Sequence, residues 1–336
     1  MENQLTRYGA IAKGVPFTTG KTFFVVQSTD KQYSKFANAF PPDDEGVVRV
    51  YTTIQSAVTA VAADTDPAAG HVILVKPGDI TDMTGDPTSY AETVIIPATC
   101  ANLTIKGMFD SRTQGGLPQI KKGSGAVAQI TIRAPGCTID SMGINGIGAT
   151  GGGILLDDDT STKTAFGTTI RNCHFKNCVG TTATNAATGG AIMWSSTGGS
   201  WQVLIKGNRF YKNVGDIVLL GTSLNQPQDV IIEDNIFSGP AASVDCNLFL
   251  SAGSGMNGVI IRNNEFTAMP AIGAGTNARF AVLTGCTGMM VGNSFATSTT
   301  LTFGATGTGA IVPVTVFMPK NYRETTTGVS SEVFRT

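Results

Sequence analysis

The chain has 336 residues, which is enough for one large solenoid or for two domains. Charged residues make up 14% of the chain and the formal net charge is −1, so the composition argues against nucleic-acid or anionic-membrane binding. No apolar run reaches the length of a membrane span, and the polar start Met1–Gln4 is unlike a signal peptide, so we expect neither membrane insertion nor export.

The chain has few histidines and no suitably spaced cysteine pair from which a metal site could be built. The cysteines include no Cys-x-x-Cys pair, and only His71 and His174 could join them. We therefore expect no zinc or iron site of this type. The free thiols fit assembly in a reducing cytoplasm, and Cys173 is predicted to be a small buried residue. His174 is predicted to be a surface imidazole. The six cysteines are Cys100, Cys137, Cys173, Cys178, Cys246 and Cys286.

Residues 1–47 lack the repeat that organises the rest of the chain. Thr22–Val26 has the composition of a strand, Lys31–Phe40 is predicted to form a short helix, and Pro41–Gly46 is a turn-rich break. The segment is too apolar to be plain disorder. We therefore predict an N-terminal arm that anchors the protein to a partner.

A strand, a helix and a second strand are predicted next. Val47–Tyr51 and His71–Val75 have the composition of strands. Residues 53–63 place apolar side chains at helical spacing, which predicts an amphipathic helix. The side chains on its apolar face are Ile54, Ala57, Val58 and Val61.

One eight-residue pattern then recurs and ends each time in phenylalanine. The phenylalanines lie 35, 27, 29 and 29 residues apart, an aliphatic residue lies five positions before each, and asparagine lies two positions before four of them. Cys173 takes the asparagine position in the remaining copy. Such a period predicts stacked coils, because a single repeat cannot bury its own apolar face. The copies are Thr168–Phe175, Val203–Phe210, Val230–Phe237, Val259–Phe266 and Gly288–Phe295.

A second short apolar strand follows in each repeat, and earlier segments continue the pattern less regularly. Glu92–Pro97 and Asn102–Gly107 are predicted to begin the coils, and Ile139 with Ile144 continues them. The second strands are predicted at Ala191–Trp194, Asp216–Leu220, Asn247–Leu250 and Phe280–Leu283.

These repeats resemble the coils of right-handed parallel β-helix proteins of the pectate-lyase-like group. Asn208, Asn235, Asn264 and Asn293 resemble that group's internal asparagine ladder, in which amides about 4.8 Å apart bond from coil to coil. The helix at 53–63 resembles the helix that caps the open end of such solenoids. The resemblance implies an all-β, right-handed parallel β-helix.

The predicted division of the chain has three parts. Residues 1–47 form the arm, residues 48–310 form the β-helix with its capping helix, and residues 311–336 form a final strand and a tail. Pro313 lies within the predicted strand Ile311–Phe317, which marks that strand as an edge.

Charged residues four positions before the repeat's last residue are predicted to point outward and to stack in one column. Arg262 in this column suggests a substrate groove with an arginine base, as in pectate lyases. We favour a solvated charge ladder, because the signs alternate from Lys206 through Glu233 to Arg262. The predicted members are Asp140, Arg171, Lys206, Glu233 and Arg262.

The densest acidic group is Asp157-Asp158-Asp159. It could bind calcium or act as acid and base on a sugar bond, but neighbours in sequence point in different directions, which favours a solvated loop. Weaker candidates for calcium binding or catalysis are the scattered acids Asp229, Asp234, Asp245 and Glu265.

Trp194 and Trp201 flank the loop 195–200. They could stack on a sugar ring, but we favour a role in fastening the loop to its coil. The Gly-His-Gly and Asn-Thr-Asp motifs of β-helix polygalacturonases are absent from the sequence. We therefore predict no catalytic residue, no cofactor and no metal, and a protein that is not an enzyme.

The region from Gly20 to Gly78, with GKTFFVV, FPPDDEGVVRVYTTIQSAV and HVILVKPG, also resembles β-helix proteins encoded with the structural genes of tailed phages. That resemblance implies a virion protein assembled in the host cytoplasm, most simply a capsid decoration protein. Its arm would contact the major capsid protein or other virion proteins. Whether the protein forms a homotrimer is left open by the sequence. The alternatives are a tail spike or other polysaccharide-cleaving lyase or hydrolase, and a carbohydrate-binding β-helix without catalysis.

Overall fold

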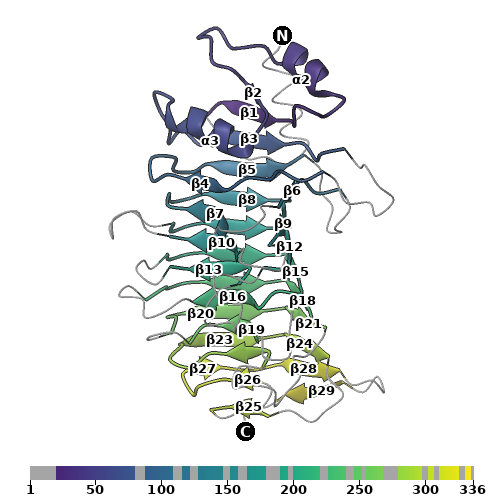
Figure 1. The fold of residues 1–336 in the computed structure, drawn as a ribbon. Helices are drawn as coiled ribbons and strands as arrows, with labels where there is room; N and C mark the ends of the chain where they lie inside the picture. The colour runs from purple at the N-terminus through teal and green to yellow at the C-terminus, as the bar shows by residue number, and fades with distance from the viewer. Residues whose placement is uncertain are drawn as a thin grey trace.

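Three long sheets wrap around a single core to form a solenoid (Figure 1). The computed structural model describes residues 20–79, 88–108, 116–121, 128–146, 152–157, 165–178, 190–195, 200–219, 226–239, 246–251, 255–267, 279–296, 302–305, 310–324 and 330–333. Successive strands pass from one sheet to the next, and each sheet grows by one strand per coil, which is the arrangement of a parallel β-helix.

The first sheet has 11 strands. In spatial order they are β2 (Val50–Tyr51), β1 (Thr22–Val25), β3 (Val72–Val75), β5 (Thr104–Gly107), β8 (Thr138–Asp140), β11 (Thr169–Arg171), β14 (Leu204–Lys206), β17 (Ile231–Glu233), β20 (Val259–Arg262), β23 (Gly288–Val291) and β27 (Val316–Phe317).

The second and third sheets have nine strands each. The second contains β25 (Phe303–Gly304), β26 (Ala310–Ile311), β22 (Ala281–Val282), β19 (Cys246–Phe249), β16 (Gly215–Leu219), β13 (Ile192–Trp194), β10 (Gly152–Leu156), β7 (Ala128–Ile132) and β4 (Val94–Ile96). The third contains β29 (Ser330–Val333), β28 (Asn321–Glu324), β24 (Ser294–Ala296), β21 (Glu265–Phe266), β18 (Ile236–Ser238), β15 (Arg209–Tyr211), β12 (His174–Lys176), β9 (Gly143–Asn145) and β6 (Gln119–Ile120).

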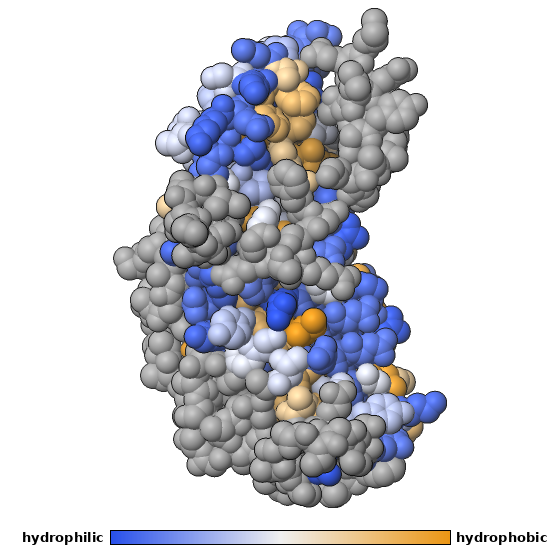
Figure 2. Space-filling view, turned by 90° about the vertical axis from the view of Figure 1, so that its right-hand side faces the viewer, coloured by the Kyte–Doolittle hydropathy of each residue, from blue (hydrophilic) through white to orange (hydrophobic). Residues whose placement is uncertain are grey.

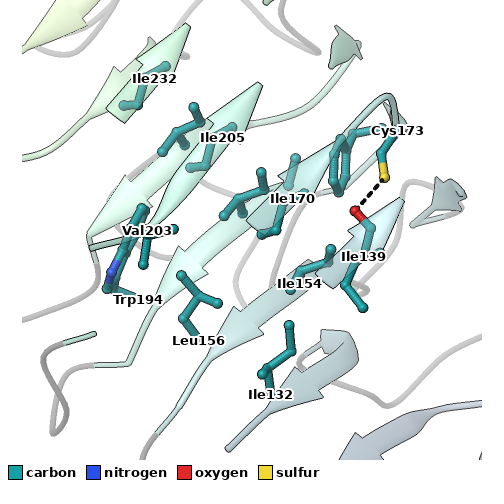
Figure 3. Packing of buried hydrophobic residues seen from close by; sticks show 14 of the residues in the cluster. Ile132, Ile139, Ile154, Leu156, Ile170, Cys173, Trp194, Val203, Ile205 and Ile232 are labelled. Carbon is teal, nitrogen blue, oxygen red and sulfur yellow. Dashed lines mark hydrogen bonds between the residues drawn. The ribbon is translucent and has the colours of Figure 1, made fainter. Parts of the chain in front are cut away.

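The interior is built from columns of identical or similar side chains. Parallel pairing places Ile170, Ile205, Ile232 and Ile261 directly opposite one another on neighbouring strands of the first sheet. All four are fully buried, and Figure 3 shows three of them, Ile170, Ile205 and Ile232, on successive strands of this packing. The predicted aliphatic column is confirmed.

The repeat phenylalanines form the second interior column. Phe210, Phe237 and Phe266 are fully buried, with ring centroids 4.9 and 4.6 Å apart and planes within 16° of parallel. Phe175 and Phe295 extend the stack at 5.1 and 4.8 Å. The stacking follows from coil spacing, because a strand separation of about 4.8 Å is also a favourable distance between offset aromatic rings.

The predicted asparagine ladder is confirmed and continues one coil further than the repeat. Asn235 Nδ2 donates to Asn264 Oδ1 at 3.0 Å, and Asn293 Nδ2 donates to Asn321 Oδ1 at 2.9 Å. Asn321 was missed because Arg323 stands where the other repeats have phenylalanine.

The left-handed backbone conformation at this bend falls on the residue before each ladder asparagine. Examples are Asp234 (φ 57°) and Asn263 (φ 55°). The ladder asparagines are therefore selected for their side-chain hydrogen bonds, and the preceding position for backbone tolerance.

The N-terminal end is capped as predicted. Helix α3 (Ile54–Ala62) buries Ile54, Ala57, Val58 and Val61, and its first turn is held by Thr53 and by Glu92, which accepts from the backbone N–H groups of Ile54 and Gln55 at 2.8 and 2.7 Å. These contacts satisfy amide groups that would otherwise lack partners at a helix start.

The segment expected to form an arm contributes to the first sheet. Strand β1 pairs with β3 on one side and with β2 on the other, so Thr22–Val25 is part of the solenoid wall. Helix α2 (Tyr33–Ala39) follows it, and Phe36 and Phe40 pack against Phe24 outside the main core. Residues 1–19 lie outside the described residues, and anchoring by this segment stays a prediction.

The C-terminal end differs from the single strand expected at residues 311–317. The chain forms β26 in the second sheet and β27 in the first, with Pro313 between them. Proline cannot donate a backbone hydrogen bond, so it suits the corner between two sheets. The predicted tail then adds β28, and β29 pairs antiparallel to it at the end of the third sheet.

Candidate functional site

A column of charged side chains runs along the outer face of the first sheet. Strand register places Lys106, Asp140, Arg171, Lys206, Glu233 and Arg262 opposite one another from coil to coil. We call this set the charge column. Its last five members are those predicted from the repeat, and Lys106 extends it toward the N-terminus.

The first half of the charge column is organised around Asp140, whose side chain is only 1% exposed. Asp140 lies 2.9 Å from Lys106 Nζ and 3.0 Å from Arg171 Nη2. Asn172 Nδ2 and the Ser141 hydroxyl donate to its other oxygen at 3.1 and 2.9 Å. Burial alone would raise the pKa of Asp140, but the hydrogen bonds from Lys106 and Asn172 and the nearby positive charges outweigh it and lower this pKa.

The second half is organised around Glu233. Lys206 Nζ lies 2.8 Å from one of its oxygens, and Arg262 Nε donates to the other at 2.6 Å. The hydrogen bond from Lys206, supported by Arg262, outweighs burial and lowers the pKa of Glu233. Arg262 is held in an ion pair with Glu233, which favours the predicted charge ladder over an arginine base. The ladder was predicted to be solvated, but its carboxylates Asp140 and Glu233 are buried.

The other acidic candidates are dispersed. Asp157 follows β10 of the second sheet and pairs with Arg133 at 3.1 Å, whereas Asp234 follows β17 of the first sheet and lies 3.4 Å from Lys206. Glu265 is exposed on β21. In the part of the chain that the structure describes, no three His, Cys, Asp or Glu side chains are grouped as a metal site would need. Asp158, Asp159 and Asp245 lie outside it.

Both histidines are buried within the fold. The prediction of a surface imidazole at His174 is wrong: this side chain is 7% exposed on β12, with Leu117 and Gln119 lining the same narrow space. His71 is also buried, and its Nδ1 accepts from the Lys21 backbone N–H at 3.0 Å while Nε2 lies 2.8 Å from the Asp66 carbonyl.

All six cysteines are free and buried, and burial was predicted for Cys173. Burial raises the pKa of Cys137 and of Cys173 to about 12, so both remain protonated and poorly nucleophilic. Cys173 continues the asparagine column as a small buried residue, and its backbone N–H donates to Asn208 Oδ1 at 2.9 Å.

The two tryptophans have different environments. Trp194 is fully buried, and its Nε1 donates to the Ser200 carbonyl at 3.2 Å, so it fastens the ends of its loop as predicted. Trp201 lies outside this arrangement, with 42% of its surface exposed. The same role was predicted for both residues, and the structure supports it for Trp194.

Trp201 lies in a hollow at the corner where coils enter the first sheet. The hollow has a volume of about 230 Å³ and is lined by Phe166, Trp201, Gln202, Gln228 and Asp229; we call it the corner hollow. Backbone bonds from Gly167 to Trp201 (2.8 Å) and from Gln202 to Gln228 (2.9 Å) hold three successive coils together here.

The chemistry of the corner hollow combines exposed aromatic surface with polar groups. Phe166 and Trp201 are each 42% exposed. Within the described part of the chain, the side chains of Gln202, Gln228 and Asp229 form no hydrogen bond or ion pair, so their polar atoms face solvent. Aromatic faces with nearby amide and carboxylate groups suit the apolar face and hydroxyl groups of a sugar.

A sequence signal for the corner hollow existed and was missed. Phe166, Trp201 and Gln228 each lie nine positions before a repeat phenylalanine, at Phe175, Phe210 and Phe237. Our alignment of the repeats started seven positions before that residue. Extending it would have placed Phe166 beside Trp201.

On the side of the third sheet, the described residues that are visible are mostly hydrophilic, with smaller apolar patches and one larger apolar patch near the N-terminal end (Figure 2). No helix among the described residues is both long and apolar enough to cross a membrane.

The sequence matches no known protein family and no curated protein. Its structure is similar to a GH136 lacto-N-biosidase from Eubacterium ramulus, with a TM-score of 0.53 and 10% identity over 96% of this chain and 58% of that one. The chain therefore spans well under two thirds of that protein. A pectin methylesterase from Aspergillus niger matches with a TM-score of 0.35 and 14% identity over 95% and 93% of the two chains. The fold is a right-handed parallel β-helix, as predicted, and likeness at this identity carries no activity with it.

Proposed function

We propose that this protein binds a carbohydrate through the corner hollow. The observation that carries the proposal is the pair of exposed aromatic side chains, Phe166 and Trp201, on adjacent coils. Aromatic surface exposed to water is unfavourable, and a sugar ring stacked on these side chains would remove that surface from water. The neighbouring side chains of Gln228 and Asp229 supply acceptors and donors for hydroxyl groups.

The fold supports the proposal by making the hollow rigid. Trp201 and Gln228 are on coils whose interior columns are fully packed, and backbone bonds join these coils directly at the hollow. A preformed site loses little conformational entropy on binding, so a small contact area can still produce measurable affinity.

Intrinsic fluorescence tests the proposal directly, because the chain has two tryptophans and only Trp201 is exposed. Oligosaccharides from bacterial surface and plant cell-wall polysaccharides would be titrated against the protein. We expect a saturable change in emission for those that bind. Trp201→Ala should weaken their binding at least about tenfold, equivalent to roughly 1.4 kcal/mol, when binding is followed by calorimetry.

Tyr211→Ala is a matched control, since Tyr211 is 41% exposed but lies on the third sheet. It should bind like the wild type, and Trp201→Phe should keep part of the affinity through its smaller ring. Wild-type affinity in Trp201→Ala for every bound sugar would place the binding elsewhere and contradict the proposal.

Cleavage of the bound carbohydrate is a second candidate, motivated by the carboxylate of Asp229 in the hollow. The absence of catalysis predicted from the sequence stays a prediction. New reducing ends released by the wild type but not by Asp229→Asn would identify an enzyme.

A place in a phage virion, on the head or as a spike, stays a prediction from the sequence resemblance. A spike that recognises a surface glycan would be compatible with the corner hollow. Mass spectrometry of purified particles, with copy number relative to the main coat protein, would test it.

A further inference from the structure

The charge column contains one break in its pattern. Arg171 and Lys206 lie directly opposite each other on β11 and β14, although they carry the same charge. Like charges at directly opposed positions of a sheet are destabilising. All other neighbours in the column, from Lys106 to Arg262, are oppositely charged.

The ion pairs of the charge column place no carboxylate between Arg171 and Lys206. Arg171 reaches back to Asp140 on the preceding coil, whereas Lys206 reaches forward to Glu233 and Asp234 on the following coil. Each cation thus has its carboxylate on the side away from the other. The two side chains remain accessible, with 34% and 47% of their surfaces exposed.

Four cations of the charge column pair with three carboxylates among the described residues. The cations are Lys106, Arg171, Lys206 and Arg262, and the carboxylates are Asp140 and Glu233 of the column and Asp234 beside it. An anion placed between Arg171 and Lys206 would complete an alternating ladder. It would also receive charge-assisted hydrogen bonds from both side chains.

The break and the corner hollow belong to the same two coils. Arg171 follows Phe166 by five residues, and Lys206 follows Trp201 by five. Five extended residues span at most about 17 Å, so an oligosaccharide of a few rings could reach from the hollow to the break. Its path would cross the outer face of β11 and β14, over Thr169 and Leu204.

We propose that the gap between Arg171 and Lys206 binds an anionic group, a carboxylate or a sulfate, of the carbohydrate held in the corner hollow. The proposal rests on the proposed function for the carbohydrate, but the anion position itself can be tested without any sugar. It assigns acidic rather than neutral glycans as the ligand class.

The first arm is a titration of the ¹⁵N-labelled protein with sodium sulfate at constant ionic strength, with sodium chloride as the reference. Saturable shifts should centre on Arg171, Asn172 and Gly207. Lys206→Gln should weaken sulfate binding at least about tenfold, the loss of one hydrogen bond to a charged group. Lys212→Gln is the matched control, an exposed lysine on the third-sheet side, and should bind sulfate like the wild type.

Lys206→Gln is suited to this test because Glu233 keeps its contact with Arg262. An unchanged thermal midpoint would verify the fold, and Lys206→Arg should restore sulfate binding. Equal sulfate shifts in wild type and Lys206→Gln, or shifts spread evenly over the surface, would overturn the proposal.

The second arm separates the sources of the anionic group. Dextran sulfate and carboxymethyl dextran are compared with uncharged dextran of the same length, at low and high salt. Wild type should prefer the charged polymers, less so at high salt, and Lys206→Gln should lose that preference. Trp201→Ala should leave the inorganic sulfate titration unchanged, so a failure of the corner hollow is distinguishable from a failure of the anion position. No preference for charged polymers in the wild type would overturn the assignment of acidic glycans.

Discussion

Replacing Asn235 by alanine tests the interior ladder most sharply. The side chain accepts from the Asn208 backbone N–H at 2.9 Å and donates to the Ile205 carbonyl at 3.0 Å. Both groups are buried and each would lose this hydrogen bond. The Asn208 N–H would be left unpaired, whereas the Ile205 carbonyl stays within the parallel pairing of β14 with β17. One unpaired buried group costs about 1–3 kcal/mol, so we expect a loss of about 1–3 kcal/mol in the free energy of unfolding.

Urea unfolding followed by circular dichroism would measure this loss. Asn257→Ala is the matched control, because Asn257 is only half-buried. Its side chain donates to Gln226 at 2.8 Å and accepts from the Thr287 hydroxyl at 3.4 Å, and its replacement should cost less than about 1 kcal/mol. Equal effects of the two substitutions would refute the reasoning, since the argument depends on burial of the ladder and not on asparagine itself.

Two further outcomes follow from the interior and from the charge column. Phe237→Ala should destabilise the fold by about 3–5 kcal/mol in urea unfolding, because its ring stacks on two neighbours in a fully buried column; Phe237→Leu should cost less, and an equal loss would argue against stacking. The lowered pKa of Asp140 means that the unfolded chain takes up its proton at higher pH than the folded one, so this stability is present above about pH 4 and is lost as pH falls through the folded pKa. Asp140→Asn should therefore lower the thermal midpoint at pH 7 and flatten its decline below about pH 4; an unchanged acid dependence would show that other carboxylates govern it.

The sequence predicted the interior well because the same physical constraint acts in every coil. Ile232, Asn235 and Phe237 recur at fixed offsets, since each must match the residue about 4.8 Å above and below it. A constraint repeated over five copies is visible in one sequence without any alignment of relatives.

The ends of the solenoid were harder to predict because the repeat fades there. Strand β1 has no repeat partner in the sequence, yet pairing with β3 places it in the first sheet. Asn321 continues the ladder although Arg323 replaces the phenylalanine. His174 shares its narrow space with Leu117 and Gln119 from two coils earlier, which a local pattern does not describe.

The candidate site was predicted only in part, because outward residues have no reason to repeat. Arg171, Lys206 and Glu233 were placed in one column, but the partner that each would choose depended on side-chain directions. Trp201 was noticed as a residue type, whereas its neighbour Phe166 was not, since the aromatic pair exists only when two coils are stacked.

These differences indicate where function is to be sought on such a solenoid. The interior columns through Ile205 and Phe210 are regular because any departure would leave a cavity or a clash in the coils above and below. The outer columns carry no such packing penalty, so an arrangement that is unfavourable there, such as opposed like charges or exposed aromatic surface, needs another cause. The opposed cations Arg171 and Lys206 and the exposed pair Phe166 and Trp201 are two such arrangements, and both occur on the same two coils. Their coincidence is the reason for assigning ligand binding to this part of the lateral surface and not to the acidic residues elsewhere.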